Sequence, residues 1–239
     1  MHRTTGRRAG AASSLLVLAV AAATTATASA GDVRGRLRVP SGYGEPARGE
    51  AGEARHRHYW EEWNGFLDPA EPGFDPAEEL AVVLTGEGEM APEQPGFAVA
   101  NGTLRPSTIV ERAGATLRIR NRDPMSHQLY AEGHEEFGPT PTSPGLTRQL
   151  VVGGAGDWPI RDALYAHVRG HLHVLPDLVA RAALQRDGTF IFRDVPPGTY
   201  TLKIFHRAEL VHEQPDVEVG ERELTLDPIA LAEGSEGDR

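Results

Sequence analysis

Two pairs of histidines in this chain have a spacing that could bind a metal ion. His171 and His173 flank a leucine, and His56 and His58 flank an arginine. In a β-strand, residues two apart point to the same face, so either pair could chelate Cu(II) or Zn(II) through two imidazoles. Such pairs more often form a polar strand face or a contact between sheets. We expect this second role, and most clearly for His56 and His58, which lie in a predicted loop.

The aromatic residues are densest between Tyr59 and Phe66, where Trp60 and Trp63 lie three residues apart. Exposed tryptophan rings can stack on sugar faces, so this segment could make the protein a carbohydrate-binding module. Tryptophan rings more often supply a large apolar area to a core. We expect these rings to cover an open end of a core, with ligand stacking by Trp60 and Trp63 as the alternative.

Residue patterns of common catalytic sites do not occur in the sequence. There is no Gly-x-Ser-x-Gly, His-Glu-x-x-His or Walker-type loop, and the run from His134 to Glu136 lacks a second histidine at the required place. The chain contains no cysteine, which excludes disulfides, iron–sulfur clusters and thiolate metal ligands. We therefore predict that the protein is not an enzyme.

The first thirty residues have the pattern of a secretory signal peptide. A basic start (Arg3, Arg7 and Arg8) precedes the apolar run 15–23, and small residues at 28–30 fit a cleavage site. The apolar run is too short to span a bilayer, which takes about 20 apolar residues. We predict that residues 1–30 are removed, that the product is periplasmic or secreted, and that it has no membrane span.

The charge of the chain is acidic. It carries 24 Lys and Arg against 34 Asp and Glu. Removal of residues 1–30 takes away three arginines and no acid, which leaves 21 basic side chains against 34 acidic ones and a net charge of −13. Such a surface repels nucleic-acid phosphates and anionic lipid as a whole. We expect no nucleic-acid partner, and leave an unidentified protein or cell-surface ligand as the partner.

Most of the secondary-structure elements predicted from the sequence are β-strands. An alternation of apolar and charged residues near 33–39 and a continuous apolar run at 80–84 both predict strands. Further strands are predicted at 97–99, 107–110, 116–120, 149–152, 170–174, 180–185, 189–192, 199–205, 217–219 and 224–226. Gly114 and Asp187-Gly188 predict hairpin turns between the strands beside them. Residues 178–184 could instead form a short helix. The chain is predicted to be all-β and of sandwich architecture.

Two passages share an order of residue types with a known fold family. Residues 104–130 read LRPSTIVERAGATLRIRNRDPMSHQLY, and residues 157–174 read DWPIRDALYAHVRGHLHV. In the first, Asn121 and Asp123 precede His127. These passages resemble cupredoxins, most closely the amicyanin and pseudoazurin type. The resemblance implies a cupredoxin-like Greek-key β-sandwich over residues 92–176.

The departures from that family concern the copper ligands. Aligned on Arg169-Gly170, the resemblance puts His127 at the place of the first histidine ligand and Asp162 at that of the cysteine. It puts Tyr165 at the place of the second histidine and Val168 at that of the methionine. A type 1 copper site needs a thiolate, two imidazoles and a weak thioether. Only His127 remains, so the resemblance implies a degenerate copper site, and we expect no cofactor.

Two interpretations of this degenerate site stay open. In one, His127 and Asp162, with Tyr165 or His167, form a residual site for Cu(II) or Zn(II). In the other, the carboxylate of Asp162 replaces the ion and hydrogen-bonds the imidazole in a partly buried pocket. We favour the second interpretation. It predicts that the Asp162 carboxylate lies within hydrogen-bonding or water-bridged reach of the His127 ring.

A second resemblance covers the outer parts of the chain. Residues 185–206 read QRDGTFIFRDVPPGTYTLKIFH. This run is similar to carboxypeptidase regulatory-like, or transthyretin-like, modules, whose fold is classed near carbohydrate-binding-like sandwiches. The resemblance implies a discontinuous sandwich from residues 31–91 and 177–232, interrupted by the cupredoxin-like domain and followed by a disordered tail at 233–239. A strand at 35–39 or 80–84 should then pair with the strands of 189–205.

Together these patterns predict an exported, non-catalytic binding or structural module. Exported proteins that resemble both cupredoxins and transthyretin-like modules sometimes carry a methylamine-utilisation label, which by itself implies no chemistry. A non-thiolate metal-binding protein and a carbohydrate-binding module are the alternatives.

Overall fold

The computed structural model describes residues 30–40, 43, 74–92 and 94–232. The segment with Trp60 and Trp63, the pair His56 and His58, the tail at 233–239 and all of the signal peptide except Ala30 lie outside the described residues. The expectations for these parts of the chain therefore remain predictions. Within the described residues, no helix is long and apolar enough to cross a membrane.

The described chain is all-β, and its first two sheets come from the two outer parts of the sequence. The first, named here the β1 sheet, has the strand order β12 (Ala183–Leu184), β13 (Thr189–Val195), β1 (Gly31–Arg38) and β16 (Leu224–Thr225), with β17 (Ile229–Ala230) also paired to β1. The second, the β2 sheet, has the order β11 (Leu178–Arg181), β2 (Leu80–Thr85), β14 (Gly198–His206) and β15 (Glu209–Val219).

The other two sheets come from the middle of the sequence. The β10 sheet has the order β5 (Thr108–Arg112), β10 (Arg169–Leu175), β9 (Gly156–Asp162) and β7 (Leu129–Ala131). The β6 sheet has the order β4 (Thr103–Arg105), β3 (Phe97–Ala100), β6 (Thr116–Asn121) and β8 (Thr147–Val151). The short helix α2 (Pro76–Glu79) and the 3-10 turn η1 (Glu135–Phe137) are the helical elements of the described residues.

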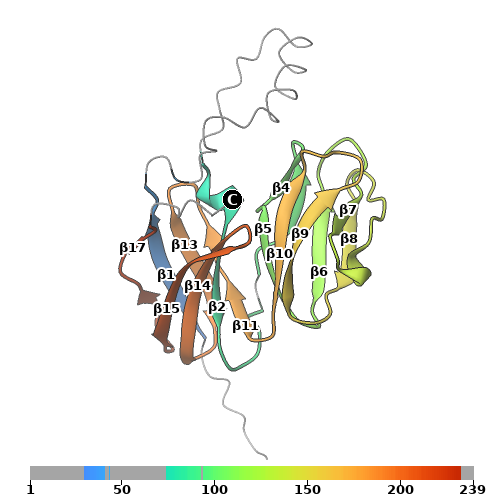
Figure 1. Ribbon diagram of the computed structural model, residues 1–239. Coiled ribbons are helices and arrows are strands. Elements are labelled where there is room, and N and C mark those ends of the chain that lie inside the picture. Colours follow the sequence, from blue (N-terminus) through green and yellow to red (C-terminus); the bar gives the residue numbers. More distant parts are fainter. Residues whose placement is uncertain (1–29, 41–42, 44–73, 93, 233–239) are drawn as a thin grey trace, which may run out of the picture.

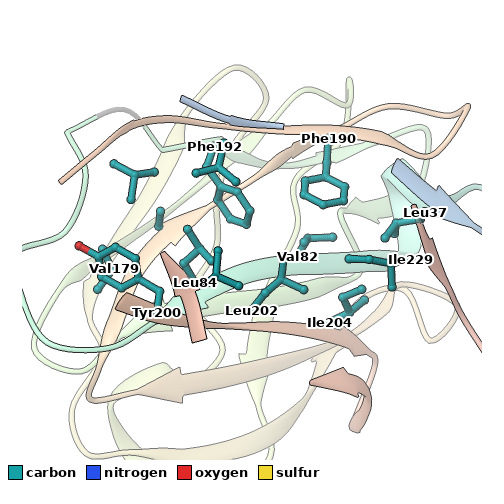
Figure 2. Close-up of a cluster of buried hydrophobic side chains, with 14 of the residues drawn as sticks. Leu37, Val82, Leu84, Val179, Phe190, Phe192, Tyr200, Leu202, Ile204 and Ile229 are labelled. Carbon is teal, nitrogen blue, oxygen red and sulfur yellow. The ribbon is translucent and has the colours of Figure 1, made fainter. Parts of the chain in front are cut away.

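The β1 and β2 sheets pack face to face as the first sandwich. Phe190 and Phe192 of β13 face Val82 of β2 and Leu202 and Ile204 of β14 across the core (Figure 2). Phe192, Leu202 and Ile204 have no exposed surface. Burial of an aliphatic or aromatic side chain of this size stabilises a fold by about 1.5–3 kcal/mol, so this interior is sufficient to hold the two sheets together.

The strand pairing expected for an interrupted first sandwich is confirmed. β1 pairs antiparallel with β13, and Gly35 lies opposite Phe190. The Phe190 ring lies over Gly35, where a β-carbon would come within 2.3 Å of it. β2 pairs antiparallel with β14 from Leu80 to Thr85. Strands separated by more than a hundred residues therefore share the sheets of one sandwich.

The β10 and β6 sheets form the second sandwich around a separate core. Ile160 of β9 and Leu172 of β10 pack with Leu117 and Ile119 of β6, and all four are buried. Figure 1 shows the two sandwiches side by side, with β1 and β13 far from the second sandwich and β5 and β10 next to the first.

Two sequence predictions about local structure need correction. Gly114 makes a turn with a positive φ of 79°, but β5 and β6 on either side of it do not pair. β5 pairs with β10, and β6 pairs with β3 and β8, so this turn connects the two sheets of the second sandwich rather than a hairpin. Residues 178–184 form strands β11 and β12, and not the alternative helix.

The two sandwiches meet through a small apolar cluster edged by polar contacts. Val83, Leu178 and Phe205 of the first sandwich form a buried cluster with Val110 of the second. At the edge of this contact, Arg181 of β11 forms an ion pair of 3.0 Å with Glu111 of β5. Both side chains are buried, with 11% and 4% of their surface exposed. The contact between the sandwiches therefore combines apolar packing with a largely buried ion pair.

Candidate site around His127

His127 and Asp162 are brought together at one end of the second sandwich. His127 lies just before β7, and Asp162 is the last residue of β9. β7 and β9 are antiparallel neighbours in which Leu129 lies opposite Asp162. Because strand pairing fixes this register, the two side chains meet although they are 35 residues apart in sequence.

The His127 ring is held between two carboxylates. Its Nδ1 forms a hydrogen bond of 2.6 Å with Oδ2 of Asp162, and its Nε2 forms one of 3.1 Å with Oδ2 of Asp123. The three residues are 1%, 5% and 6% exposed. Both ring nitrogens are thus engaged by buried carboxyl groups, and neither points to open solvent.

Backbone N–H groups hold both carboxylates in place. Oδ1 of Asp162 accepts from Leu164 at 2.8 Å and from Gln128 at 3.2 Å. The carboxylate of Asp123 accepts from the N–H groups of Asn101 and Gly102. Charge-assisted bonds of this kind are stronger than those between neutral groups. They satisfy Oδ1 of both carboxylates, and Gly102 adds a second bond to Oδ2 of Asp123.

Asn121 shapes the loop that carries Asp123 and His127. Its side-chain N–H donates to the carbonyls of Met125 at 2.7 Å and Thr142 at 2.8 Å, and its Oδ1 accepts from the backbone N–H of Asp123 at 2.9 Å. His127 and Thr142 also exchange two backbone hydrogen bonds, at 3.1 and 2.8 Å. The loop conformation that presents both Asp123 and His127 is therefore fixed by a buried amide.

The other predicted ligands, Tyr165 and His167, make different contacts. The Tyr165 ring is partly buried, and its centroid is 5.2 Å from that of the imidazole. His167 is exposed; its ring lies 6.0 Å from that of Tyr165 and packs over Gly102. Val168 is fully buried in the core of the second sandwich. The structure thus groups His127, Asp162 and Tyr165, and leaves His167 outside this group.

The prediction that the Asp162 carboxylate reaches the His127 ring is confirmed, and the partner that sequence reasoning missed is Asp123. Asp123 lies four residues before His127, and its part in the site depends on the turn that Asn121 holds. Because the two ring nitrogens point in opposite directions, one ion cannot bind the imidazole together with both carboxylates. Within the described residues, no three His, Asp or Glu side chains form a group that could hold a metal ion.

His171 and His173 make the contact between sheets that their spacing suggests. Both are buried on the face of β10 that lies opposite Leu172, and their ring centroids are 4.7 Å apart. Nε2 of His173 donates to the carbonyl of Arg207 at 2.6 Å, and its ring lies 4.4 Å from that of Phe205. Since Arg207 and Phe205 belong to the first sandwich, His173 joins the two sandwiches.

His173 should make stability depend on pH. Its burial lowers the pKa of the imidazole below the usual value near 6.5, the hydrogen bond to Arg207 opposes this, and nearby His171 lowers the pKa further while Asp157 raises it. A neutral histidine with a lowered pKa stabilises the fold fully above about pH 6.5, and the contribution is lost as pH falls through the folded-state value. Urea unfolding should therefore show a steeper loss of stability between pH 7 and 5 than in the variant His173→Gln. Equal slopes in the two proteins would contradict this role.

The chain is similar to known proteins in two regions. The family model for the β-sandwich domain of ER membrane protein complex subunit 7 matches residues 174–231, which include β11 to β17. This family differs from the carboxypeptidase regulatory-like family that residues 185–206 resemble. No curated protein matches the chain.

Among solved structures, the chain is similar to amicyanins. Amicyanin from Paracoccus versutus is 15% identical with a TM-score of 0.32, and the match covers 39% of this chain and 97% of amicyanin. A reduced mutant amicyanin is 15% identical with a TM-score of 0.31, covering 39% of this chain and 98% of its own. A similarity at this level does not bear on whether this chain binds copper. The strand pairing and the two cores make the described chain an all-β protein of sandwich architecture.

Proposed function

We propose that this chain is an exported, non-catalytic binding or structural module in which a buried Asp–His–Asp group occupies the place of a cupredoxin copper site. One observation carries the proposal: both nitrogens of His127 lie within hydrogen-bonding distance of a carboxylate oxygen, at 2.6 and 3.1 Å. A histidine ligand must offer a free nitrogen lone pair to the ion. Here, both nitrogens are engaged inside the fold, and the group stabilises the end of the sandwich.

We also propose how the two domains are arranged along the chain and where the protein is located. A transthyretin-like sandwich of residues 31–91 and 177–232 is interrupted by a cupredoxin-like sandwich of residues 92–176. The pairings of β1 with β13 and of β2 with β14 support this arrangement. The basic and apolar pattern of residues 1–30 supports export, so we place the protein in the periplasm or outside the cell.

The residual metal site is the second candidate, because Tyr165 lies close to the His127–Asp162 pair. Calorimetric titration of the mature protein with Cu(II) and Zn(II), after treatment with chelator, separates the two candidates. We expect weak binding that is the same in wild type and in Asp162→Asn, because exposed imidazoles such as that of His167 would account for it. The variant His167→Gln is the matched control and should remove part of that weak signal.

Tight binding of either ion that is lost in Asp162→Asn and retained in His167→Gln would overturn the proposal. It would assign the site to a metal, because His127 and Asp162 would then have to rearrange around the ion. Protons compete with metals for imidazole, so such binding would also strengthen as pH rises.

A further inference from the structure

The outer face of the β1 sheet carries a row of arginines. Arg34, Arg36 and Arg38 alternate along β1 with the buried residues Val33 and Leu37. Because successive side chains of a strand point to opposite faces and each residue advances about 3.3 Å, the three guanidinium groups leave one face at intervals of about 6.6 Å. The side chains of Arg34 and Arg36 are 53% and 58% exposed.

Neighbouring elements add two more arginines to this row. Arg193 lies on β13, the strand paired with β1, and its side chain is 54% exposed. Arg186 precedes the Asp187-Gly188 turn and is 84% exposed. Arg36, Arg38 and Arg186 together line a recess of about 730 Å³ at the end of β1. We name these five residues the arginine face: Arg34, Arg36, Arg38, Arg186 and Arg193.

The three β1 residues of the arginine face point away from the core of the first sandwich. The β1 sheet is the layer of the first sandwich that lies farther from the second sandwich (Figure 1). Its apolar side is filled by the core residues of Figure 2, so Arg34, Arg36 and Arg38 occupy the opposite, outer side. A long, narrow ligand could therefore lie along β1 and reach several guanidinium groups at once.

The acidic partners of Arg34 and Arg36 are exposed, at 51% and 59% of their side-chain surface, whereas the partners of Arg193 and Arg186 are 29% and 14% exposed. Arg34 pairs with Glu223 at 3.0 Å, Arg186 with Asp75 at 2.8 Å, and the looser contacts of Arg36 with Asp187 and of Arg193 with Asp32 are 4.0 and 3.9 Å. Ion pairs open to water contribute little stability. A ligand carboxylate can therefore replace Glu223 or Asp187 beside Arg34 and Arg36 at small cost, and a guanidinium group can bind a carboxylate through two parallel hydrogen bonds.

We propose that the arginine face binds a linear polysaccharide that carries carboxylate groups. The chain as a whole has a net charge of −10, so its general field does not attract polyanions and only a local cluster can. A narrow polymer lying along β1 meets the arginines and avoids most of the acidic surface. A planar anionic bilayer would also meet the acids around the face, which disfavours it. This inference rests on the proposed role as a binding module.

The second sandwich offers a matched control. Arg118, Arg120 and Arg122 are also exposed, along and just after β6. There, Arg118 and Arg120 lie opposite Gln149 and Thr147 of β8, whereas β1 has Arg193 on its neighbouring strand. Replacing either triplet by glutamine removes the same charge from the same kind of exposed strand position.

Binding to immobilised polygalacturonate at low ionic strength, with neutral dextran as the reference polymer, tests the proposal. Wild type should bind polygalacturonate and not dextran, and binding should weaken as salt rises. The triple variant Arg34→Gln/Arg36→Gln/Arg38→Gln should bind about tenfold more weakly. The variant Arg118→Gln/Arg120→Gln/Arg122→Gln should stay within about twofold of wild type, because it leaves the arginine face intact.

Three results would overturn the inference: no binding of polygalacturonate at low salt, an equal loss in both triple variants, or a loss only when Trp60 and Trp63 are replaced by alanine. Preferential binding to phosphatidylglycerol vesicles through the β1 arginines would overturn it too, in favour of a membrane surface. Each of these results leaves the proposed non-catalytic role standing. Shortening of the polymer by the protein would instead contradict that role.

Discussion

Replacing His127 by leucine is expected to lower the free energy of unfolding by about 3–5 kcal/mol. The substitution removes the imidazole that hydrogen-bonds both Asp123 and Asp162, and it leaves two carboxylates that are 6% and 5% exposed without their shared partner. Breaking a buried pair from one side is costly because the remaining charge stays away from water. Urea unfolding followed by circular dichroism at pH 7 measures the difference from wild type.

A second variant distinguishes two causes of this loss of stability, namely the loss of charge pairing and a poor fit of leucine in the site. Adding Asp123→Asn and Asp162→Asn to His127→Leu removes both uncompensated charges, while each asparagine oxygen can still accept a backbone N–H. We expect this triple variant to regain a large part of the lost stability. A triple variant that is less stable than His127→Leu alone would show that the charges are not the source of the effect.

Replacing Glu111 by alanine is expected to lower the free energy of unfolding by about 3 kcal/mol. Arg181 would keep its hydrogen bonds to the carbonyl of Val110 and to Gln94, and its place over the Phe97 ring at 4.5 Å, but would lose its counter-charge. Burial already lowers the pKa of Arg181, while the charge of Glu111 and its hydrogen bond raise it. The guanidinium therefore depends on Glu111 within the contact between the sandwiches.

The conservative variant Glu111→Gln is the control for this second prediction. It keeps the side-chain oxygen and the volume of Glu111 and removes only the charge, so it should lose less stability than Glu111→Ala. In calorimetry, wild type should unfold in one transition, because the apolar cluster and this ion pair couple the two sandwiches. A loss below about 0.5 kcal/mol in Glu111→Ala, as for a surface substitution, would contradict a structural role for the pair.

The sequence predicted the strands more reliably than the way in which they pair. The alternation around Val33 and Leu37 and the apolar run at 80–84 identify β1 and β2, because burial of one or both strand faces leaves a direct pattern. The partner of β5 does not follow from such a pattern. Gly114 indicates a turn, and a turn of this kind can join two strands of one sheet or cross between the sheets of a sandwich.

The candidate site was predictable only in part. The resemblance to cupredoxins predicted that His127 and Asp162 lie together, and the pairing of β7 with β9 brings them together. The role of Asp123 depends on how the loop after β6 folds, and that loop is held by Asn121 through contacts with Met125 and Thr142. No spacing rule in sequence predicts those contacts, since they are set by the position of Thr142 in a distant loop.

The most direct measurement of the central claim is a ¹⁵N–¹H correlation spectrum of the His127 ring in the mature, chelator-treated protein. We predict protons on both Nδ1 and Nε2, protected from exchange with water because His127 is 1% exposed, and a spectrum that does not change when Zn(II) is added. The pattern should be lost in Asp162→Asn, which removes the closer of the two carboxylates. A ring with one unprotonated nitrogen, or ring signals that shift when Zn(II) is added at a stoichiometric amount, would contradict the claim that carboxylates hold His127 in place of a metal.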